Sequence, residues 1–169
     1  MLKKRIIPVQ LLLKNRLVKT KLFDKFIDVG NPIRSSKIYN DSDADELIFL
    51  NIDKKERSIK PLLQVLEEVS KVCFMPLALG GGIKDLEDIK TLFRSGADKV
   101  IINSAIYKNY TLITKASNLF GKQSIVVSID AKKDNRNEKY ILFSECGKKK
   151  EDISLLEHVK TCEKNGAGE

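Results

Sequence analysis

Residues 75–104 read MPLALGGGIKDLEDIKTLFRSGADKVIINS, a stretch with the pattern of one complete strand–helix–strand unit. It opens with an apolar run, Met75 to Gly80, and closes with a second one, Lys99 to Ser104. In the amphipathic segment between them, Asp85 is placed to cap a helix and Gly96 to end it. The residues that would form the buried face of this helix are Leu86, Ile89, Leu92 and Phe93. Two nearly continuous apolar strands joined in this way predict a parallel sheet in an α/β fold.

The same alternation of strands and helices extends in both directions along the chain. The other predicted strands are Arg5 to Leu13, Glu46 to Ile52 and Ser124 to Ala131, with a shorter run, Tyr140 to Ser144, in the loop after the last. The other predicted helices are a segment from Asn31-Pro32 through Tyr39, one that Ser58 caps, Asn109 to Gly121, and Ile153 to Val159. About five βα units of this kind fit either a doubly wound sheet or a (β/α)8 barrel, and a whole barrel typically needs about 250 residues.

The composition excludes several classes of protein. With 169 residues, 42% hydrophobic and 32% charged, the chain is typical of a globular domain. Its apolar run near the N-terminus, Ile6 to Leu13, is too short to span a membrane and lacks a signal-peptide cleavage site, so a cytoplasmic protein is predicted. Cys73, Cys146 and Cys162 have no CxxC spacing, so no disulfide framework, metal site or cofactor is predicted. The net charge of +8 is scattered, without aromatic residues in the lysine-rich runs, which argues against a nucleic-acid partner.

Polar or glycine residues follow four of the five predicted strands at the carboxyl end. In α/β folds the active and ligand-binding sites lie at this end of the strands. The backbone N–H groups of Gly80-Gly81-Gly82 are suited to cradling an anion, and Asn103 and Ser104 are placed to bond the same phosphate. A tight turn is the alternative explanation of the glycines. Asp130 ends an apolar strand, so a low dielectric is expected to raise its pKa toward general acid or base work. A helix cap or a surface acid is the alternative for Asp130.

The amino ends of the predicted strands carry charges instead. The residues concerned are Arg5, Glu46, Lys99 and, at the start of a sixth strand, Glu169. If the sheet closed, these two cations and two anions would converge. Such a ring at the bottom of a barrel is usually a structural plug of salt bridges, and it is also what a gate for a small neutral molecule needs.

At these residues the chain resembles the cyclase subunit of imidazole glycerol phosphate synthase, and the matching motifs run along its whole length. They are Lys4-Arg5-Ile6-Ile7, Val18-Lys19, Asp45-Glu46-Leu47 with Phe49-Leu50, Gly80-Gly81-Gly82-Ile83, Gly96-Ala97-Asp98-Lys99-Val100 with Ile102-Asn103, Ser128-Ile129-Asp130-Ala131-Lys132, Gly147-Lys148-Lys149 and Gly166-Ala167-Gly168-Glu169. The resemblance implies a (β/α)8 barrel that receives ammonia from a glutaminase docked at its bottom and delivers it to a bis-phosphorylated substrate at its top. It also implies that residues 1–169 are the N-terminal part of a single barrel domain whose last three units are missing, as in a fragment, a frameshifted product or a cut chain.

The resemblance also assigns roles to individual residues. Arg5, Glu46, Lys99 and Glu169 match the family's ammonia gate, and Gly82, Asn103 and Ser104 match one phosphate site, beside Gly81. Asp130 matches one of two catalytic aspartates, and Lys19 matches a lysine on a mobile loop over the site.

Two positions depart from the family pattern. Leu11 stands at the position of the other catalytic aspartate, and a leucine can neither exchange a proton nor bond to the substrate. Asn51 stands where the family tends to carry an aspartate, so a second carboxylate has become neutral.

Leu11 beside an intact charged ring resembles a divergent branch of the same family, associated with amidination of bacterial surface sugars. In that branch the barrel works with a glutaminase and a separate sugar amidotransferase. The leading hypothesis is therefore an ammonia-conducting subunit for acetamidino formation on a surface sugar, with a phosphorylated small molecule or sugar as substrate. Two alternatives remain open. One is the cyclase activity of histidine biosynthesis, and the other is a non-catalytic barrel that binds and activates a glutaminase.

Overall fold

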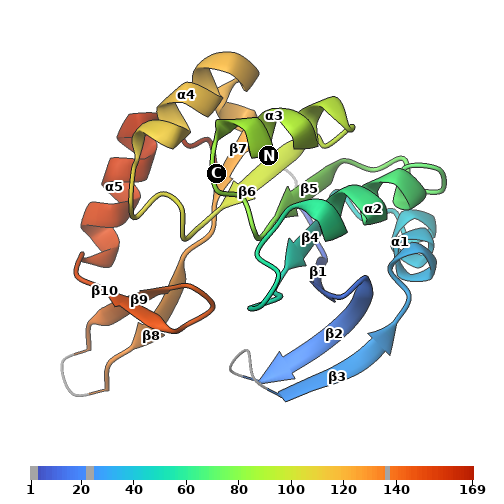
Figure 1. Ribbon diagram of the computed structural model, residues 1–169, viewed down its shortest axis with the longest axis horizontal. Helices are drawn as coiled ribbons and strands as arrows, with labels where there is room; N and C mark the ends of the chain where they lie inside the picture. Colours follow the sequence, from blue (N-terminus) through green and yellow to red (C-terminus); the bar gives the residue numbers. More distant parts are fainter. Residues whose placement is uncertain (1–3, 22–24, 136–137) are drawn as a thin grey trace.

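The protein is described by a computed structural model that covers residues 4–21, 25–135 and 138–169. Its main sheet has the strand order β3-β2-β1-β4-β5-β6-β7 (Figure 1). The parallel strands of this sheet are β1 (Val9–Leu13), β4 (Leu47–Asn51), β5 (Leu77–Gly80), β6 (Lys99–Ile102) and β7 (Ile125–Val127). Each lies beside the parallel strand that precedes it in the chain, so the order never reverses. A doubly wound sheet has a reversal point, so the observed order favours the barrel type of α/β fold.

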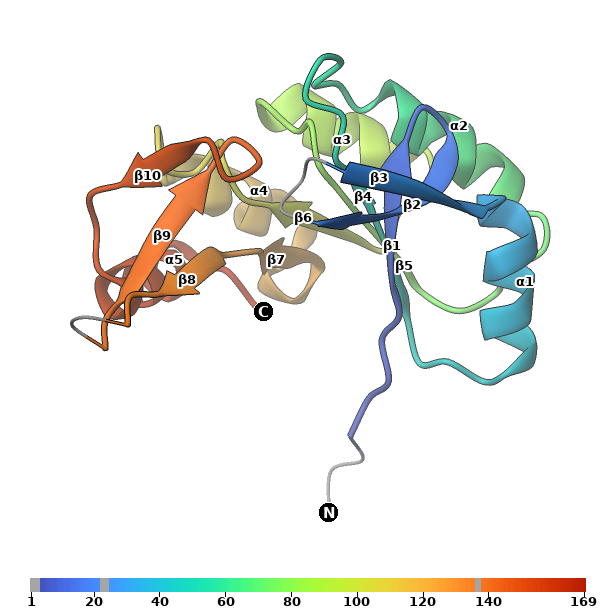
Figure 2. The same cartoon turned by 90° about the horizontal axis from the view of Figure 1, so that it is seen from below.

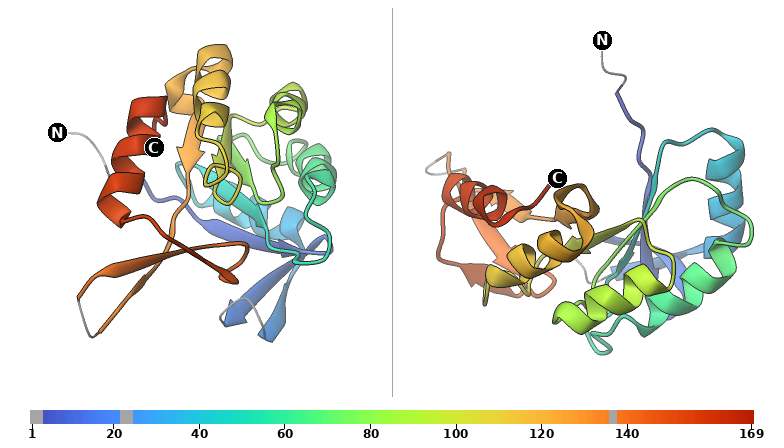
Figure 3. Two further views of the ribbon diagram at one scale, coloured as in Figure 1. Left: turned by 60° about the vertical axis from the view of Figure 1, so that its left-hand side comes forward. Right: turned by 90° about the horizontal axis from the view of Figure 1, so that it is seen from above.

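The helices cover one side of this sheet, in an arc that the right-hand view of Figure 3 shows. They are α1 (Pro32–Asp41), α2 (Lys60–Val69), α3 (Leu86–Arg94), α4 (Thr111–Phe120) and α5 (Leu155–Asn165). One-sided cover is what the outer ring of a (β/α) barrel requires, whereas a doubly wound sheet carries helices on both faces. The described part of the sheet is open and does not close into a barrel.

The hydrophobic core lies between the helices and the side of the sheet that faces them. Alternate strand residues such as Leu12, Phe49 and Leu79 are fully buried there. Helix residues pack against them, including Leu62, Leu66, Ile89, Leu92, Ile113 and Ala116. Neighbouring strand residues point to the other, helix-free side. The pairing register joins Leu11, Leu50, Gly80, Ile101 and Val126 into one row across that side.

Four predicted strands are confirmed as β1, β4, β5 and β6, with shorter bounds. β1 begins at Val9 and β5 at Leu77, each directly after a proline, Pro8 and Pro76. Proline has no backbone N–H for the ladder, which explains the later starts.

The prediction of one continuous strand from Ser124 to Ala131 is wrong. That stretch forms β7 and then β8 (Asp130–Lys133), which belongs to a different sheet. β8 pairs with β9 (Tyr140–Ser144), and β9 pairs with β10 (Lys149–Glu151), both antiparallel. The predicted run Tyr140 to Ser144 is thus the central strand of a small sheet, which lies below α5 in Figure 1.

The hairpin of β2 (Arg16–Lys21) and β3 (Lys25–Gly30) was not predicted. It extends the main sheet at the edge beyond β1, as Figure 2 shows. Lys19, expected in a loop, lies on β2 opposite Ile27 and is exposed. The register shifts between Leu17 and Val18, so two consecutive residues are buried and the alternation that signals a strand is broken.

Two helix starts agree with the sequence and three do not, with α4 and α5 each beginning two residues later than predicted. The side chains of Asn31 and Asp85 cap α1 and α3 as predicted, and Ser154 caps α5, which begins and ends later than expected. The prediction that Ser58 caps a helix is wrong: α2 begins at Lys60, and the buried Ser58 Oγ has no partner among the described residues.

Candidate functional site

A cavity of about 640 Å³ opens at the carboxyl ends of β4 to β7. The predicted phosphate-binding residues Gly81, Gly82, Asn103 and Ser104 all line it, and so does Asp130. The chain brings these residues together from three different loops because parallel strands end at the same edge of the sheet. Leu11 and Lys19 are not among the lining residues.

The glycine loop after β5 needs its glycines for two reasons. Gly81 and Gly82 have left-handed φ angles of 88° and 87°. A Cβ atom at Gly81 would collide with the backbone of Asn51, and one at Gly82 would lie 2.5 Å from the carbonyl oxygen of Ser58. The tight-turn explanation of these glycines is therefore correct, and anion binding by their backbone stays a proposal.

Several backbone N–H groups around the cavity are unused. Within the described residues, the N–H groups of Gly81, Gly82, Ser104 and Ala105 donate no hydrogen bond to protein acceptors. Buried or partly buried amide donors without protein acceptors are suited to an anion or to water. This arrangement supports the predicted phosphate site on backbone donors.

Asn103 and Asp130 form a hydrogen-bonded pair in the cavity. Asn103 Nδ2 donates to Asp130 Oδ2 at 3.1 Å, so this amide group holds the carboxylate. A bond from Asn103 to a phosphate stays a prediction. Burial raises the pKa of Asp130, and the hydrogen bond from Asn103 offsets part of that rise. A carboxyl group in this state is suited to proton transfer nearer neutral pH.

The turn between β9 and β10 closes one side of the cavity, a contact that was not predicted. The backbone N–H of Glu145 donates to Ser104 Oγ at 2.9 Å, so the Ser104 hydroxyl keeps its own proton to donate elsewhere. Arg57 holds the same turn through Glu145, with Nη1–Oε2 at 3.4 Å and Nη2 donating to the carbonyl oxygen at 3.3 Å. Because Arg57 and Glu145 lie 88 positions apart, no local pattern indicates the pair.

Asn51 has a structural role. Its Nδ2 donates to the carbonyl oxygens of Ser58, at 2.9 Å, and Glu56, at 3.4 Å, while its Oδ1 accepts from the backbone N–H of Asp53 at 3.1 Å. The side chain therefore fixes the loop after β4, against which the glycine loop packs. An ionised aspartate cannot donate to the two carbonyl groups, which gives a physical reason for the amide at this position.

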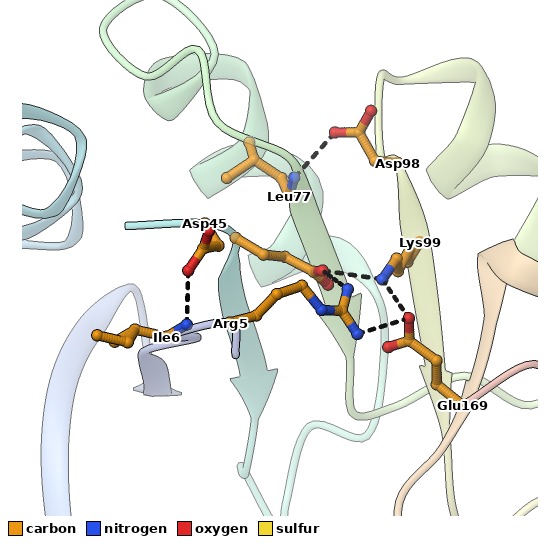
Figure 4. Close-up of polar contacts among 8 residues, drawn as sticks. Arg5, Ile6, Asp45, Leu77, Asp98, Lys99 and Glu169 are labelled. Atoms are coloured by element: carbon orange, nitrogen blue, oxygen red, sulfur yellow. Dashed lines mark hydrogen bonds and ion pairs between the residues drawn. The ribbon is translucent and has the colours of Figure 1, made fainter. Parts of the chain in front are cut away.

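The four charged residues at the amino ends of the strands form a ring. Arg5 Nη1 and Lys99 Nζ lie 3.3 Å and 2.8 Å from Glu46 Oε2, and Arg5 Nη2 and Lys99 Nζ lie 2.9 Å and 2.8 Å from Glu169 Oε1. Figure 4 shows Arg5 and Lys99 directed at Glu169. The predicted convergence is thus present, although the sheet is open. A gating role for the ring stays a proposal.

Two aspartates beside the ring hold the backbone. Asp45 Oδ2 accepts from the N–H of Ile6 at 2.6 Å, and Asp98 Oδ2 accepts from the N–H of Leu77 at 2.8 Å (Figure 4). Burial by itself would raise the pKa of Glu169, but hydrogen bonds from Lys99 and Arg5 outweigh it and lower that pKa. Neither aspartate was singled out from the sequence as part of this assembly.

No metal-binding group of three or more His, Cys, Asp or Glu side chains is found within residues 4–21, 25–135 and 138–169. The cysteines Cys73, Cys146 and Cys162 are free, and Cys146 lines the cavity. In the same described ranges, no helix is both long and apolar enough to cross a bilayer.

The sequential parallel sheet, the helices on one side and the cavity at the carboxyl ends of the strands define an α/β protein of the (β/α)-barrel class. A family described as "Histidine biosynthesis protein" matches residues 5–169. The chain belongs to this family.

Individual relatives carry a more specific name. The chain is 41% identical to the imidazole glycerol phosphate synthase subunit HisF of Staphylococcus epidermidis and 38% identical to that of Petrotoga mobilis. Each comparison covers all 169 residues of this chain and 67% of the relative. These names agree with the histidine-biosynthesis alternative and give no support to sugar amidination.

Proposed function

We propose that the chain acts as an ammonia-dependent cyclase subunit of the imidazole glycerol phosphate synthase type. The observation that carries this proposal is the Asn103–Asp130 pair, which lies in one cavity with unused backbone donors. A carboxyl group with a raised pKa beside an anion cradle fits acid or base chemistry on a phosphorylated substrate. The names of the relatives support the same assignment.

In this proposal the carboxyl ends of the strands bind the substrate, and the amino ends admit ammonia. The glycine loop and the Ser104–Ala105 backbone bind a phosphate group and thereby orient the substrate. Asp130 exchanges a proton with it, held in place by Asn103. The ring of Arg5, Glu46, Lys99 and Glu169 stands at the opposite end, where a glutaminase subunit docks and ammonia enters.

Leu11 favours a second candidate function, the amidination of a surface sugar together with a separate amidotransferase. Leu11 lies in an apolar row and supplies no second carboxylate. If the cyclase reaction requires two carboxylates, this chain handles ammonia for another acceptor. A barrel that only binds and activates a glutaminase is the non-enzymatic rival.

One assay separates these functions. The full-length protein is supplied with an ammonium salt and the bis-phosphorylated ribulosyl substrate of the cyclase family, so that no glutaminase is needed. We expect turnover by the natural protein and a loss of about 100-fold or more in Asp130→Asn, the scale of a lost general acid or base.

The Leu11→Asp variant is the matched control. Absence of turnover in the natural protein together with activity in Leu11→Asp would overturn the cyclase proposal in favour of the sugar candidate. Unchanged ammonia transfer from a glutaminase in Asp130→Asn would favour the non-catalytic barrel.

A further inference from the structure

A buried histidine, His158, lies outside the cavity and has no task in the proposed function. It belongs to the first turn of α5, and its side chain is fully buried. Burial lowers the pKa of His158, and the negative charge of the nearby Glu151 offsets only part of that effect. The imidazole ring is therefore neutral at pH 7.

The ring of His158 contacts two tyrosines of the loop after β6. The Tyr107 ring stacks on it, with the ring centroids 4.4 Å apart and the planes 4° from parallel. The Tyr110 hydroxyl lies 2.7 Å from His158 Nδ1, a hydrogen bond that either neutral tautomer can make. The Tyr107 hydroxyl is buried and has no partner in the described part of the chain, so stacking alone joins that ring to α5.

The helix that carries His158 is fixed at both ends. Ser154 caps its start, and at its end Thr114 Oγ1 donates to Asn165 Oδ1 at 2.9 Å, which joins α5 to the neighbouring α4 (Figure 1). His158 Nε2 also lies 3.8 Å from Cys162 Sγ, one turn farther along the same helix. The imidazole ring therefore has a fixed support.

The loop that contains the two tyrosines also carries Asn103 and Ser104 of the cavity. Its backbone is a run of tight turns, in which the N–H of Ile106 donates to the carbonyl oxygen of Asn103 and the N–H of Asn109 donates to that of Ile106, both at 3.1 Å. Ile106 is fully buried and attaches the loop to the core. The tyrosines attach the same short loop to α5, so the position of Asn103 depends on both contacts.

Packing alone does not explain a histidine at this position. A buried polar group costs free energy unless it is hydrogen-bonded, and an apolar ring would stack on Tyr107 without that cost. What the imidazole ring adds is a hydrogen bond of defined length and direction to Tyr110. Buried hydrogen bonds of this kind specify one arrangement of the groups that they join.

We propose that His158 is a positioning residue, which acts through the two tyrosines to hold the Asn103 amide against Asp130. The contacts run from α5 to the tyrosines, along the loop to Asn103, and through the 3.1 Å hydrogen bond to Asp130. The inference rests on the proposed function in one respect, because Asp130 is the group that exchanges a proton there. The contacts themselves do not depend on which reaction Asp130 serves.

The pKa of Asp130, measured in the full-length protein by carbon-13 NMR titration of its carboxyl group, tests the proposal. Tyr110→Phe and His158→Phe each remove the hydrogen bond and keep an aromatic ring. Each change should weaken the hydrogen bond from Asn103 and so raise the pKa of Asp130, because that bond favours the ionised carboxylate. Tyr110 is only partly buried, so Tyr110→Phe is expected to fold even if His158→Phe does not.

Thr114→Val is the matched control. It also removes one hydroxyl that bonds α5, but at the opposite end of that helix, and Thr114 does not line the cavity. It should leave the pKa of Asp130 unchanged. In an Asn103→Leu background, Tyr110→Phe should cause no further rise, since the amide through which it acts is already gone.

An Asp130 pKa that stays the same in both tyrosine and histidine variants would overturn the proposal. So would an equal rise in Thr114→Val, because general loosening of α5 would then explain it, or an undiminished rise in the Asn103→Leu background. Turnover with ammonium salt is a separate measurement. A natural protein without turnover, whose Asp130 pKa still responds to Tyr110→Phe, would refute the cyclase function and support the positioning role of His158.

Discussion

At the scale of single residues, the Asn103–Asp130 pair sets the chemistry of the cavity. Burial raises the pKa of Asp130, and the donated hydrogen bond from Asn103 keeps that rise smaller than burial alone would cause. The carboxyl group therefore keeps its proton up to a higher pH in the folded chain than in the unfolded chain. Its contribution to stability is present below the ordinary value of 3.8 and is lost as the pH rises through the raised pKa.

Replacing Asn103 by leucine should raise the pKa of Asp130 further, because the ionised carboxylate loses a hydrogen bond worth about 1.5–3 kcal/mol. Carbon-13 NMR titration of the Asp130 carboxyl group measures the change. Ser104→Ala, which removes a neighbouring cavity hydroxyl that does not touch Asp130, is the control. An Asp130 pKa that is the same in natural protein and Asn103→Leu would show that the pair does not tune the carboxyl group.

Asn51 offers a second prediction at this scale. Asn51→Asp should lower the free energy of unfolding by about 1–3 kcal/mol at pH 7, because the ionised side chain cannot donate to Ser58 and Glu56. The loss should shrink at acidic pH, where a protonated aspartate donates again. Urea denaturation at both pH values measures it, with Asn118→Asp on the exposed side of α4 as control. Equal losses at the two positions would contradict the role given to the amide.

At the scale of elements, the glycine loop after β5 is constrained by its neighbours. Gly81 and Gly96 both have left-handed φ angles, 88° and 104°, but only Gly81 meets the backbone of another loop where a Cβ would stand. Gly96→Ala should cost about 1 kcal/mol from backbone conformation alone. Gly81→Ala should cost about 3 kcal/mol or more, because backbone atoms of Asn51 must also move. Chemical denaturation measures the loss in free energy of unfolding for each variant. Similar losses would show that the backbone of Asn51 moves at little cost to make room for the added Cβ.

The elements with regular patterns are those that the sequence predicted. Apolar strands such as Leu47–Asn51 and the capped helix Leu86–Arg94 follow from local periodicity and from Asp85. The β2–β3 hairpin was missed because the register shift at Leu17 and Val18 interrupts its alternation. The division of residues 124–131 between two sheets depends on pairing with β9, which lies farther along the chain.

The residues of the candidate site also fall into a predicted and an unpredicted group. Gly81, Gly82, Asn103, Ser104 and Asp130 were found because strand ends are visible in the sequence, and the cavity unites them. Arg57 and Glu145 were missed, since their places depend on a contact between two distant loops. The hydrogen bond from the Asn103 amide to Asp130 depends on side-chain geometry that no sequence pattern specifies.

At the scale of the whole molecule, the charged ring ties the beginning of the described chain to its end. The pKa of Glu169 is lowered on balance, so its contribution to stability is present above the ordinary value of 4.5 and is lost as the pH falls through the lowered pKa. Burial would lower the pKa of Lys99, but its hydrogen bonds to Glu169 and Glu46 raise it on balance. That contribution is present below 10.5 and is lost as the pH rises through the raised pKa.

Glu169→Gln should therefore lower the free energy of unfolding by about 1 kcal/mol at neutral pH, a modest value because the side chain is 34% exposed. The difference from the natural protein should begin to fade only below pH 4.5, as the pH falls through the lowered pKa of Glu169. Thermal unfolding from neutral pH down to about pH 2 measures it, with Glu163→Gln as the control at an exposed position of α5. A deficit that does not change with pH would mean that the ion pairs of Glu169 contribute nothing to stability.

The strand order also governs how the chain folds while it is being made. Each parallel strand pairs with the one synthesised before it, so a nascent chain leaving the ribosome at about 5–20 residues per second can add strands one at a time to an edge that already exists. The closing contact is different, because Arg5 and Glu169 lie 164 positions apart. Arg5 is translated long before Glu169 and must wait until that residue has been added before it meets its partner.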